Sequence, residues 1–166
     1  MQELQWLDGY SGQTLDELIR LEGECRIDSL VLAFEQAMVK KATRVGHDKL
    51  THEERVILAV EALEREVNNG GYDQFFVNSS REHAPIIVDA LRRIGYPKTA
   101  EITQGALRVV LKNPISYEEI KVGTWRDDGK RQNAPDECDN LYFERPENIE
   151  ECLFAFVKAN RATIEP

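Results

Sequence analysis

Carboxylates are the side chains of this sequence whose number and spacing suggest a chemical role. Seven lie within residues 1–28, where they accompany two arginines, and seven lie within residues 136–151, where they accompany one. The candidates for contact with a partner are Asp16, Glu17, Glu22, Glu24, Asp28, Asp136, Glu137, Asp139, Glu144, Glu147, Glu150 and Glu151. Carboxylates held close together can take the place of phosphate groups in front of the lysine and arginine side chains of a basic protein.

Glu147, Glu150 and Glu151 are the best-spaced members of this set. Residues three and four apart on a helix are neighbours, with Cβ atoms about 5–6 Å apart, so these three are predicted to form one exposed patch. An ordinary solubilising surface is the alternative. The net charge of −9 is only slightly beyond the range of about 2–8 that small domains commonly carry.

The signatures of common enzymes are missing from the sequence. None of His47, His52 and His83 follows an acidic residue by three positions, which argues against the Glu-x-x-His motif of di-iron bundles. The sequence also contains no H-E-x-x-H zinc motif, no phosphate-binding loop and no G-x-S-x-G nucleophile motif. We therefore expect a protein that is not an enzyme, with no catalytic residue, no metal and no cofactor.

Two further sets of reactive side chains are expected to be structural or solvated. Cys152 occupies a core position in the last apolar stripe, whereas Glu61 and Glu64, one helical turn apart, are expected to face water. The three cysteines form no CxxC pair, and an odd number cannot make a closed set of disulfides. Reduced thiols in a cytoplasmic protein are the simpler interpretation.

Apolar residues repeat at helical spacing through most of the chain, and no comparable run alternates with period two. The predicted helices follow Thr14, carry the stripes Ile27–Met38, Val56–Val67, Ile86–Ile94 and Ile102–Leu111, and end with Ile149–Val157. Capping boxes are predicted at Thr14, Thr51, Ser79 and Ser116. The pattern predicts an all-α fold, a single-domain helical bundle of about seven or eight helices.

The 166 residues correspond to about one domain. Within it, a helical hairpin at 1–45 is expected to precede a helical core at 46–160. The segment 116–135 contains a predicted surface loop that Trp125 anchors. Apolar runs are far shorter than the roughly 20 residues that span a bilayer, so no membrane partner is expected.

The most unusual segment is the bend at residues 68–80, where three aromatic residues lie among amide and hydroxyl side chains. One interpretation is a recognition loop. The polar side chains that it would present are Asp73, Gln74 and Asn78. The other interpretation is that Tyr72, Phe75 and Phe76 fill the core while Asn and Ser side chains bond the backbone of neighbouring turns.

Three sequence motifs surround this bend: L-T-x-E-E-R at 50–55, V-x-A-L-x-x-E-V-N-N-G-G-Y-D-Q-F-F-x-N-S-S at 60–80, and D-A-L-x-x-I-G at 89–95. Together they resemble a bacterial family first catalogued as a domain of unknown function and now named after its DNA-mimic member. The match is dense over about 50–111 and looser over 136–160. The residues of the central motif, expected to be structural because they are neutral or apolar, are Asn69, Gly70, Gly71, Tyr72, Asp73, Gln74, Phe75, Phe76 and Asn78.

The resemblance implies an all-α homodimer whose surface carboxylates imitate DNA phosphates and occupy the DNA-binding site of a basic transcriptional regulator. No direct binding of nucleic acid is expected, because the negative charge repels a polyanion. Two alternatives stay open. One is an inhibitor or immunity-type protein that neutralises a basic partner such as a nuclease, and the other is an enzyme with a site at the 69–80 bend.

Overall fold

The computed structural model describes residues 3–110, 136–144 and 148–166. The predicted loop with Trp125, the predicted cap at Ser116, the last stripe residue Leu111 and Glu147 lie outside these residues.

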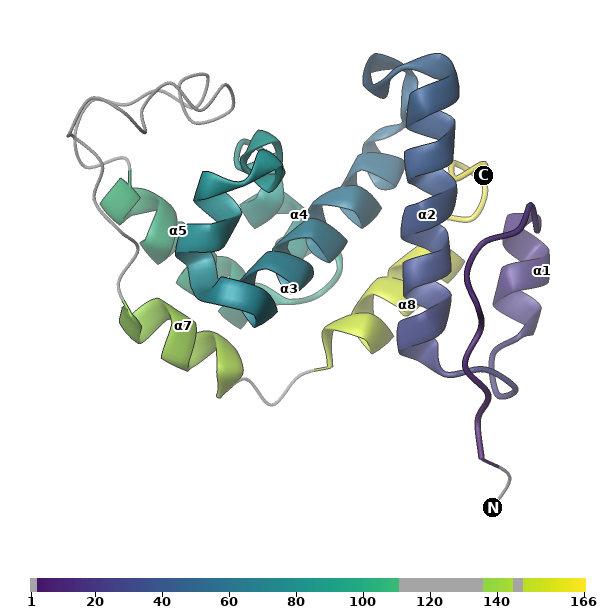
Figure 1. Cartoon of the computed structure of the whole chain (residues 1–166), viewed down its shortest axis with the longest axis horizontal. Helices are drawn as coiled ribbons and strands as arrows, with labels where there is room; N and C mark the ends of the chain where they lie inside the picture. Colours follow the sequence, from purple (N-terminus) through teal and green to yellow (C-terminus); the bar gives the residue numbers. More distant parts are fainter. Residues whose placement is uncertain (1–2, 111–135, 145–147) are drawn as a thin grey trace. The chain divides into compact units, whose positions relative to one another are not determined.

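The chain is all-α, as the apolar spacing predicts. The described residues form seven α-helices and two short 3-10 helices (Figure 1). These are α1 (Leu15–Arg20), α2 (Ile27–Val45), η1 (His47–Lys49), α3 (His52–Val77), η2 (Ser79–His83), α4 (Ile87–Arg93), α5 (Pro97–Val110), α7 (Asp136–Phe143) and α8 (Ile149–Ala159). Extended pairing in this part of the chain is limited to isolated bridges of Cys25 with Gln5 and Glu22.

Two of the predicted capping boxes form. The Thr14 hydroxyl accepts from the Glu17 amide at the start of α1, and the Glu17 carboxylate accepts from the Thr14 amide. Thr51 and Glu54 make the same reciprocal pair at the start of α3. The box predicted at Ser79 is wrong, because residues 79–83 form a tight 3-10 turn without a side-chain cap instead of the first turn of an α-helix.

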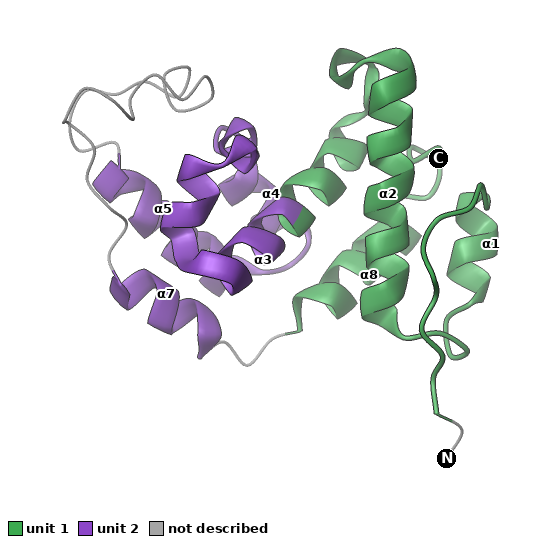
Figure 2. Ribbon diagram, in the orientation of Figure 1, with its two compact units in different colours: residues 1–61, 148–166 green, residues 62–147 purple. Residues whose placement is uncertain are grey.

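The chain divides into two compact units, and the boundary falls inside α3 (Figure 2). Unit 1 comprises Met1–Glu61 and Asn148–Pro166, and unit 2 comprises Ala62–Glu147. The predicted division into a part at 1–45 and a part at 46–160 stays a prediction, and the compact units divide the chain at other positions.

In unit 1, α2 packs against α1 and α8. The contact with α8 includes a stacked pair of buried rings, Phe34 and Phe154, whose centroids lie 5.9 Å apart. Every helix in the described segments is too short or too polar to cross a membrane.

A buried carboxylate, Glu54, joins three segments of unit 1. It accepts from Lys41 Nζ at 2.7 Å and from the Glu165 amide at 2.9 Å, in addition to its cap to Thr51. Burial raises the pKa of Glu54, but hydrogen bonds from the Glu165 amide, Lys41 and the Thr51 amide lower it by more. The pKa of Glu54 therefore lies below its ordinary value. The paired charge therefore fastens the C-terminal segment to α2 and α3.

In unit 2, α5 packs against α4 and α7. The three aromatic residues of the bend, Tyr72, Phe75 and Phe76, are fully buried, and the rings of Phe75 and Phe76 meet edge to face at 5.3 Å. The interpretation in which these rings fill the core is confirmed.

Emptying this aromatic core is expected to destabilise the protein severely. Phe75→Ala or Phe76→Ala should each lower the free energy of unfolding by about 3–5 kcal/mol, because each leaves a cavity that neighbours cannot fill. Denaturant titration followed by circular dichroism measures the change. The matched control is Phe143→Ala, whose ring is 56% exposed and whose loss should cost under about 1 kcal/mol. Losses of under about 1 kcal/mol at both core positions would contradict the core assignment.

Candidate functional site

α3 is interrupted in its last third by two glycines, Gly70 and Gly71. Gly71 has a φ of +73°, in the left-handed region that favours glycine. A Cβ atom at Gly71 would also collide with the carboxylate of Asp139 in α7. The predicted end of the helix at this point is confirmed, but the chain resumes helical structure directly afterwards, at Tyr72.

Asp139 caps the helical segment that begins at Tyr72. Its Oδ1 accepts a hydrogen bond from the Tyr72 amide at 2.8 Å. At a helix break, an amide loses the carbonyl four residues earlier that would accept its hydrogen bond. The Asp139 carboxylate accepts in place of that carbonyl, as a capping side chain does at an ordinary helix start. Asp139 is half-buried, so one of the predicted partner-binding carboxylates has a structural contact of its own.

The bend is organised around the carboxylate of Glu66, which is only 7% exposed. Its Oε2 accepts from Gln74 Nε2 at 2.9 Å and from Asn78 Nδ2 at 2.8 Å. Its Oε1 accepts from Ser80 Oγ at 2.8 Å. Three side chains of the bend thus converge on one buried anion.

This arrangement corrects two expectations. The prediction that Asn and Ser side chains bond the backbone holds for Asn68, which donates to the Glu64 carbonyl oxygen at 2.7 Å, but not for Asn78 and Ser80. A recognition loop would present Gln74 to a partner, whereas this side chain is turned to Glu66. A carboxylate binds these donors in preference to the backbone because charge-assisted hydrogen bonds are about twice as strong as neutral ones.

The hydrogen bonds also set the charge state of Glu66. Burial raises its pKa, but donation from Gln74, Ser80 and Asn78, with the nearby charge of Arg65, outweighs that effect. The pKa of Glu66 therefore lies below its ordinary value, and the group stays ionised at neutral pH. Sequence reasoning missed this role. The signal was present, since Glu66 is one of the defined positions of the 60–80 motif, two residues before Asn68.

A second network fixes α7 within unit 2. The Tyr72 and Thr103 hydroxyls are 2.7 Å apart, and the Tyr72 ring meets the buried Tyr142 ring edge to face at 5.8 Å. The Tyr142 hydroxyl donates to Glu64. The expectation that Glu64 faces water is therefore wrong: it is half-buried and accepts from Tyr142 and Asn68.

Because Asp139 and Tyr142 point inward, the opposite face of α7 points outward. The exposed residues on that face, at positions one helical turn apart or adjacent, are Asp136, Glu137, Asn140, Leu141 and Glu144. The three carboxylates of this acidic face have no hydrogen-bond or ion-pair partner within the described segments. The outermost two, Asp136 and Glu144, are eight positions apart, which corresponds to about 12 Å at the helical rise of about 1.5 Å per residue. Glu144 directly follows the last residue of α7.

The pKa of the Cys138 thiol reflects the negative electrostatic potential around α7. Burial raises the pKa of Cys138, and the charges of Asp139 and Glu137 raise it further. The thiol therefore stays protonated at neutral pH in a negative environment.

The N-terminal carboxylates belong to unit 1. Asp16, Glu17, Glu22 and Glu24 are exposed, and Asp28 is half-exposed. Several are already used within the unit: Glu17 caps α1, Glu22 pairs with Lys158 at 2.6 Å, and Asp28 pairs with Arg26. For Asp16 and Glu24, the described segments supply no such partner.

The third predicted group lies at the start of α8. Asn148 caps this helix by accepting from the Glu151 amide at 3.1 Å. Glu151 is exposed, whereas Glu150 is half-exposed. Their predicted single patch with Glu147 includes a residue outside the described part and stays a prediction. Cys152 is half-buried instead of a full core residue, because it lies at the edge of the stripe between Ile149 and Phe156.

No group of three or more His, Cys, Asp or Glu side chains that could hold a metal occurs within residues 3–110, 136–144 and 148–166. The alternative of an enzyme site at the 69–80 bend would use polar side chains of that bend. Two of them, Tyr72 and Gln74, form hydrogen bonds within the fold, to Thr103 and Glu66 respectively.

The Glu66 network predicts a specific dependence of stability on pH. A carboxylate whose pKa is lower in the folded than in the unfolded state stabilises the fold above the unfolded value, about 4.3, and this contribution is lost as pH falls through the folded pKa. Glu66→Gln should lower the free energy of unfolding at pH 7 by about 1–3 kcal/mol, since an amide faces the three donors with one acceptor oxygen. In denaturant titrations from pH 7 to pH 3, the free energy of unfolding of the Glu66→Gln variant should fall less with pH than that of the wild type. Glu101→Gln, at an exposed position of α5, is the control and should follow the wild-type curve. A Glu66→Gln curve that coincides with both would contradict the role of the buried charge.

Comparison with known proteins places these features in a family. The model of the DMP19-like protein family matches residues 48–160. Searches of curated proteins and of solved structures gave no match. The matched range covers more than half of the chain and includes the Gly70–Gly71 break, the Glu66 network and α7. The chain therefore belongs to the DMP19-like protein family, which is named after a DNA-mimic protein.

Proposed function

We propose that this protein is a DNA mimic: an acidic, non-enzymatic module that occupies the DNA-binding surface of a basic transcriptional regulator. The observation that carries the proposal is the acidic face of α7, where Asp136, Glu137 and Glu144 are exposed without an internal partner among the described residues. Membership of the DMP19-like family supports it.

The rigidity of α7 matters as much as its charge. A flexible acidic segment would lose conformational entropy on binding, whereas a helix already held in place pays less of that cost. Asp139 and Tyr142 provide the hold, through the Tyr72 amide and Glu64. Carboxylates presented in this way can displace the counterions of a basic surface as DNA phosphates do.

Apolar side chains beside the carboxylates suit a protein partner. Leu141 is 43% exposed and Phe143 is 56% exposed, next to the acidic face. Protein interfaces gain most of their affinity from aromatic and apolar anchors, while surrounding charges set association rate and specificity. A mimic with both elements would bind its partner more selectively than a purely electrostatic surface.

Carboxylates outside α7 are further candidates for contact with the partner. The N-terminal group Asp16 and Glu24, and Glu150 with Glu151, are further candidate contacts, as are the remaining carboxylates predicted from the sequence. A homodimeric state and a cytoplasmic location stay predictions. An inhibitor of a basic nuclease would use the same chemistry, so identification of the partner distinguishes it from a mimic that acts on a regulator.

Reversal of charge on α7 should abolish partner binding without unfolding the protein. The triple variant Asp136→Lys, Glu137→Lys and Glu144→Lys replaces attraction by repulsion at three points. The partner is isolated from native lysate with the wild-type protein, identified by mass spectrometry, and then titrated in purified form. We expect affinity to fall at least about a hundredfold in the variant. Wild-type binding should weaken as salt rises, because exposed ion pairs are screened over about 8–10 Å at 0.1–0.15 M, and duplex DNA should compete.

The matched control carries the same change in net charge elsewhere. Asp48→Lys, Glu82→Lys and Glu101→Lys alter three exposed carboxylates that lie outside the predicted contacts, and affinity should change much less than in the α7 variant. A partner that binds both triple variants equally, or that duplex DNA never displaces, would count against mimicry by α7. A nuclease as the partner would favour the inhibitor alternative.

The negative potential at α7 can be measured without any partner. Cys138 should react with iodoacetamide along a pH profile whose midpoint lies above the ordinary thiol value of about 8.5. Glu137→Gln should lower that midpoint, because one of the charges that favours the protonated thiol is removed. Glu101→Gln should not change it. Mass spectrometry of the labelled peptide separates Cys138 from the other two cysteines. A midpoint that Glu137→Gln leaves unchanged would show that the carboxylate does not act on this site.

A further inference from the structure

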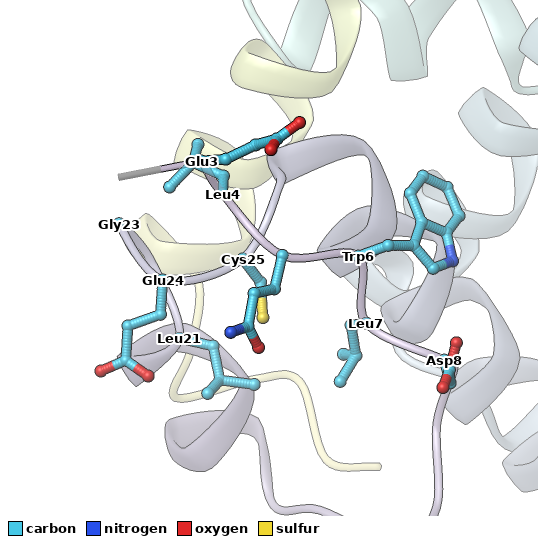
Figure 3. Close-up of a pocket in the computed structure, with 10 residues that line it drawn as sticks. Glu3, Leu4, Trp6, Leu7, Asp8, Leu21, Gly23, Glu24 and Cys25 are labelled. Carbon is cyan, nitrogen blue, oxygen red and sulfur yellow. The ribbon is translucent and has the colours of Figure 1, made fainter. Parts of the chain in front are cut away.

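Unit 1 contains a pocket of about 610 Å³ between residues 3–8 and the turn after α1 (Figure 3). Both walls precede residues 48–160, so the pocket lies outside the part of the chain that the family model matches. Its volume falls in the range of about 300–1,000 Å³ that is usual for ligand sites.

The first wall is an extended segment held by backbone pairing. The Gln5 amide donates to the Glu24 carbonyl oxygen, and the Arg26 amide donates to the Gln5 carbonyl oxygen, both at 2.9 Å. The Leu7 amide donates to Ser29 Oγ at 3.2 Å. These bonds place the segment parallel to residues 24–26 and fix its register.

The charges that line the pocket all have one sign. Glu3, Asp8 and Glu24 line it, and none of its lining residues is a lysine or arginine. Arg26, the neighbour of the lining residue Cys25 in the sequence, lies over the Trp6 ring at 5.4 Å and is already paired with Asp28. The pocket therefore favours a positively charged occupant.

The pocket also offers apolar surface. Leu7 and Leu21 line it together with the buried Cys25, and Figure 3 shows Leu21 and Glu24 on one side of the view and Trp6 and Asp8 on the other. Lysine and arginine suit such a mixture, because their aliphatic stems pack on apolar surface while the charged head stays near carboxylates.

Two observations favour a peptide over a small free cation. The backbone N–H and C=O groups of Leu4 and Trp6 have no partner within the described residues, and an unpaired edge of an extended segment can pair with another chain. The Trp6 side chain is 51% exposed, and an exposed tryptophan beside a pocket is a common anchor of protein interfaces.

We propose that this pocket binds an extended basic segment of another protein, in which lysine or arginine residues alternate with apolar residues. The segment would pair with the backbone of Leu4 and Trp6, on the edge that faces away from residues 24–26. Its long lysine and arginine side chains would reach Glu3 and Asp8, and across residues 3–8 to Glu24. This site lies in unit 1, whereas α7 lies in unit 2, so it does not depend on the proposed mimicry.

Trp6 provides the signal for a direct test. The chain has two tryptophans, so Trp125→Phe leaves Trp6 as the sole reporter. The probe is the synthetic peptide acetyl-Val-Lys-Val-Arg-Val-Lys-Val-amide, titrated into the full-length variant while tryptophan emission is recorded. We expect a saturable change, a Kd below 1 mM in order of magnitude, and no saturation with a peptide in which glutamate replaces every lysine and arginine.

Neutral substitutions and backbone methylation identify the contacts. Glu3→Gln, Asp8→Asn and Glu24→Gln together should weaken binding at least about tenfold, which corresponds to 1.4 kcal/mol. A peptide methylated on alternate backbone nitrogens should lose a similar factor. The α7 triple variant is the matched control and should bind the peptide with unchanged affinity, which separates this site from the proposed mimicry.

Calorimetry provides a second measurement that does not use fluorescence. Trp6→Ala should weaken binding of the same peptide at least about tenfold, after circular dichroism has shown an unchanged helical spectrum. The proposal is overturned by the absence of saturable binding, by equal affinity in the neutralised variant, or by equal affinity for the methylated peptide. Arginine amide that binds as tightly as the peptide would show a free-cation site and overturn the proposed occupant.

Discussion

The buried carboxylate of Glu66 is the interaction on which the shape of unit 2 depends. An isolated charge at such a position would be costly to bury, and three hydrogen-bond donors offset that cost. All three, Gln74, Asn78 and Ser80, lie after the Gly70–Gly71 break. The chain must therefore reverse within a few residues and present its polar side chains inward, and the same reversal places the bend's aromatic residues in the core.

The break in α3 and the position of α7 depend on each other. Gly71 leaves room for the Asp139 carboxylate, and that carboxylate bonds the Tyr72 amide that the break exposes. Tyr142 supports the same contact from the next helical turn, through Glu64. One face of α7 is thus engaged in packing. Among the carboxylates of this helix, Asp139 has a structural role, and the exposed ones are those proposed to face a partner.

Unit 1 uses carboxylates in a different way. Glu54 is buried and paired, and it joins Lys41, the start of α3 and the C-terminal segment. Three exposed carboxylates near the N-terminus, Glu3, Asp8 and Glu24, instead line a pocket beside Trp6. An acidic composition is therefore not a single property of this chain. Buried carboxylates stabilise the fold, and some exposed ones, such as Glu17 and Glu22, also have partners within it. Exposed carboxylates without such a partner among the described residues, such as Asp16 and Glu24, are available to a basic partner.

Local pattern was enough to predict the all-α class, most helix positions, the caps at Thr14 and Thr51 and the break at Gly70–Gly71, because spacing, capping and backbone freedom act over a few residues. The family was recognisable for the same reason, from three short motifs, each contiguous in the sequence. Sequence alone did not reveal that Glu66 and Glu54 are buried, that Glu64 bonds Tyr142, or which face of α7 is exposed. Those properties depend on contacts such as Tyr72 with Asp139, between residues 67 positions apart, and only the folded chain brings such residues together.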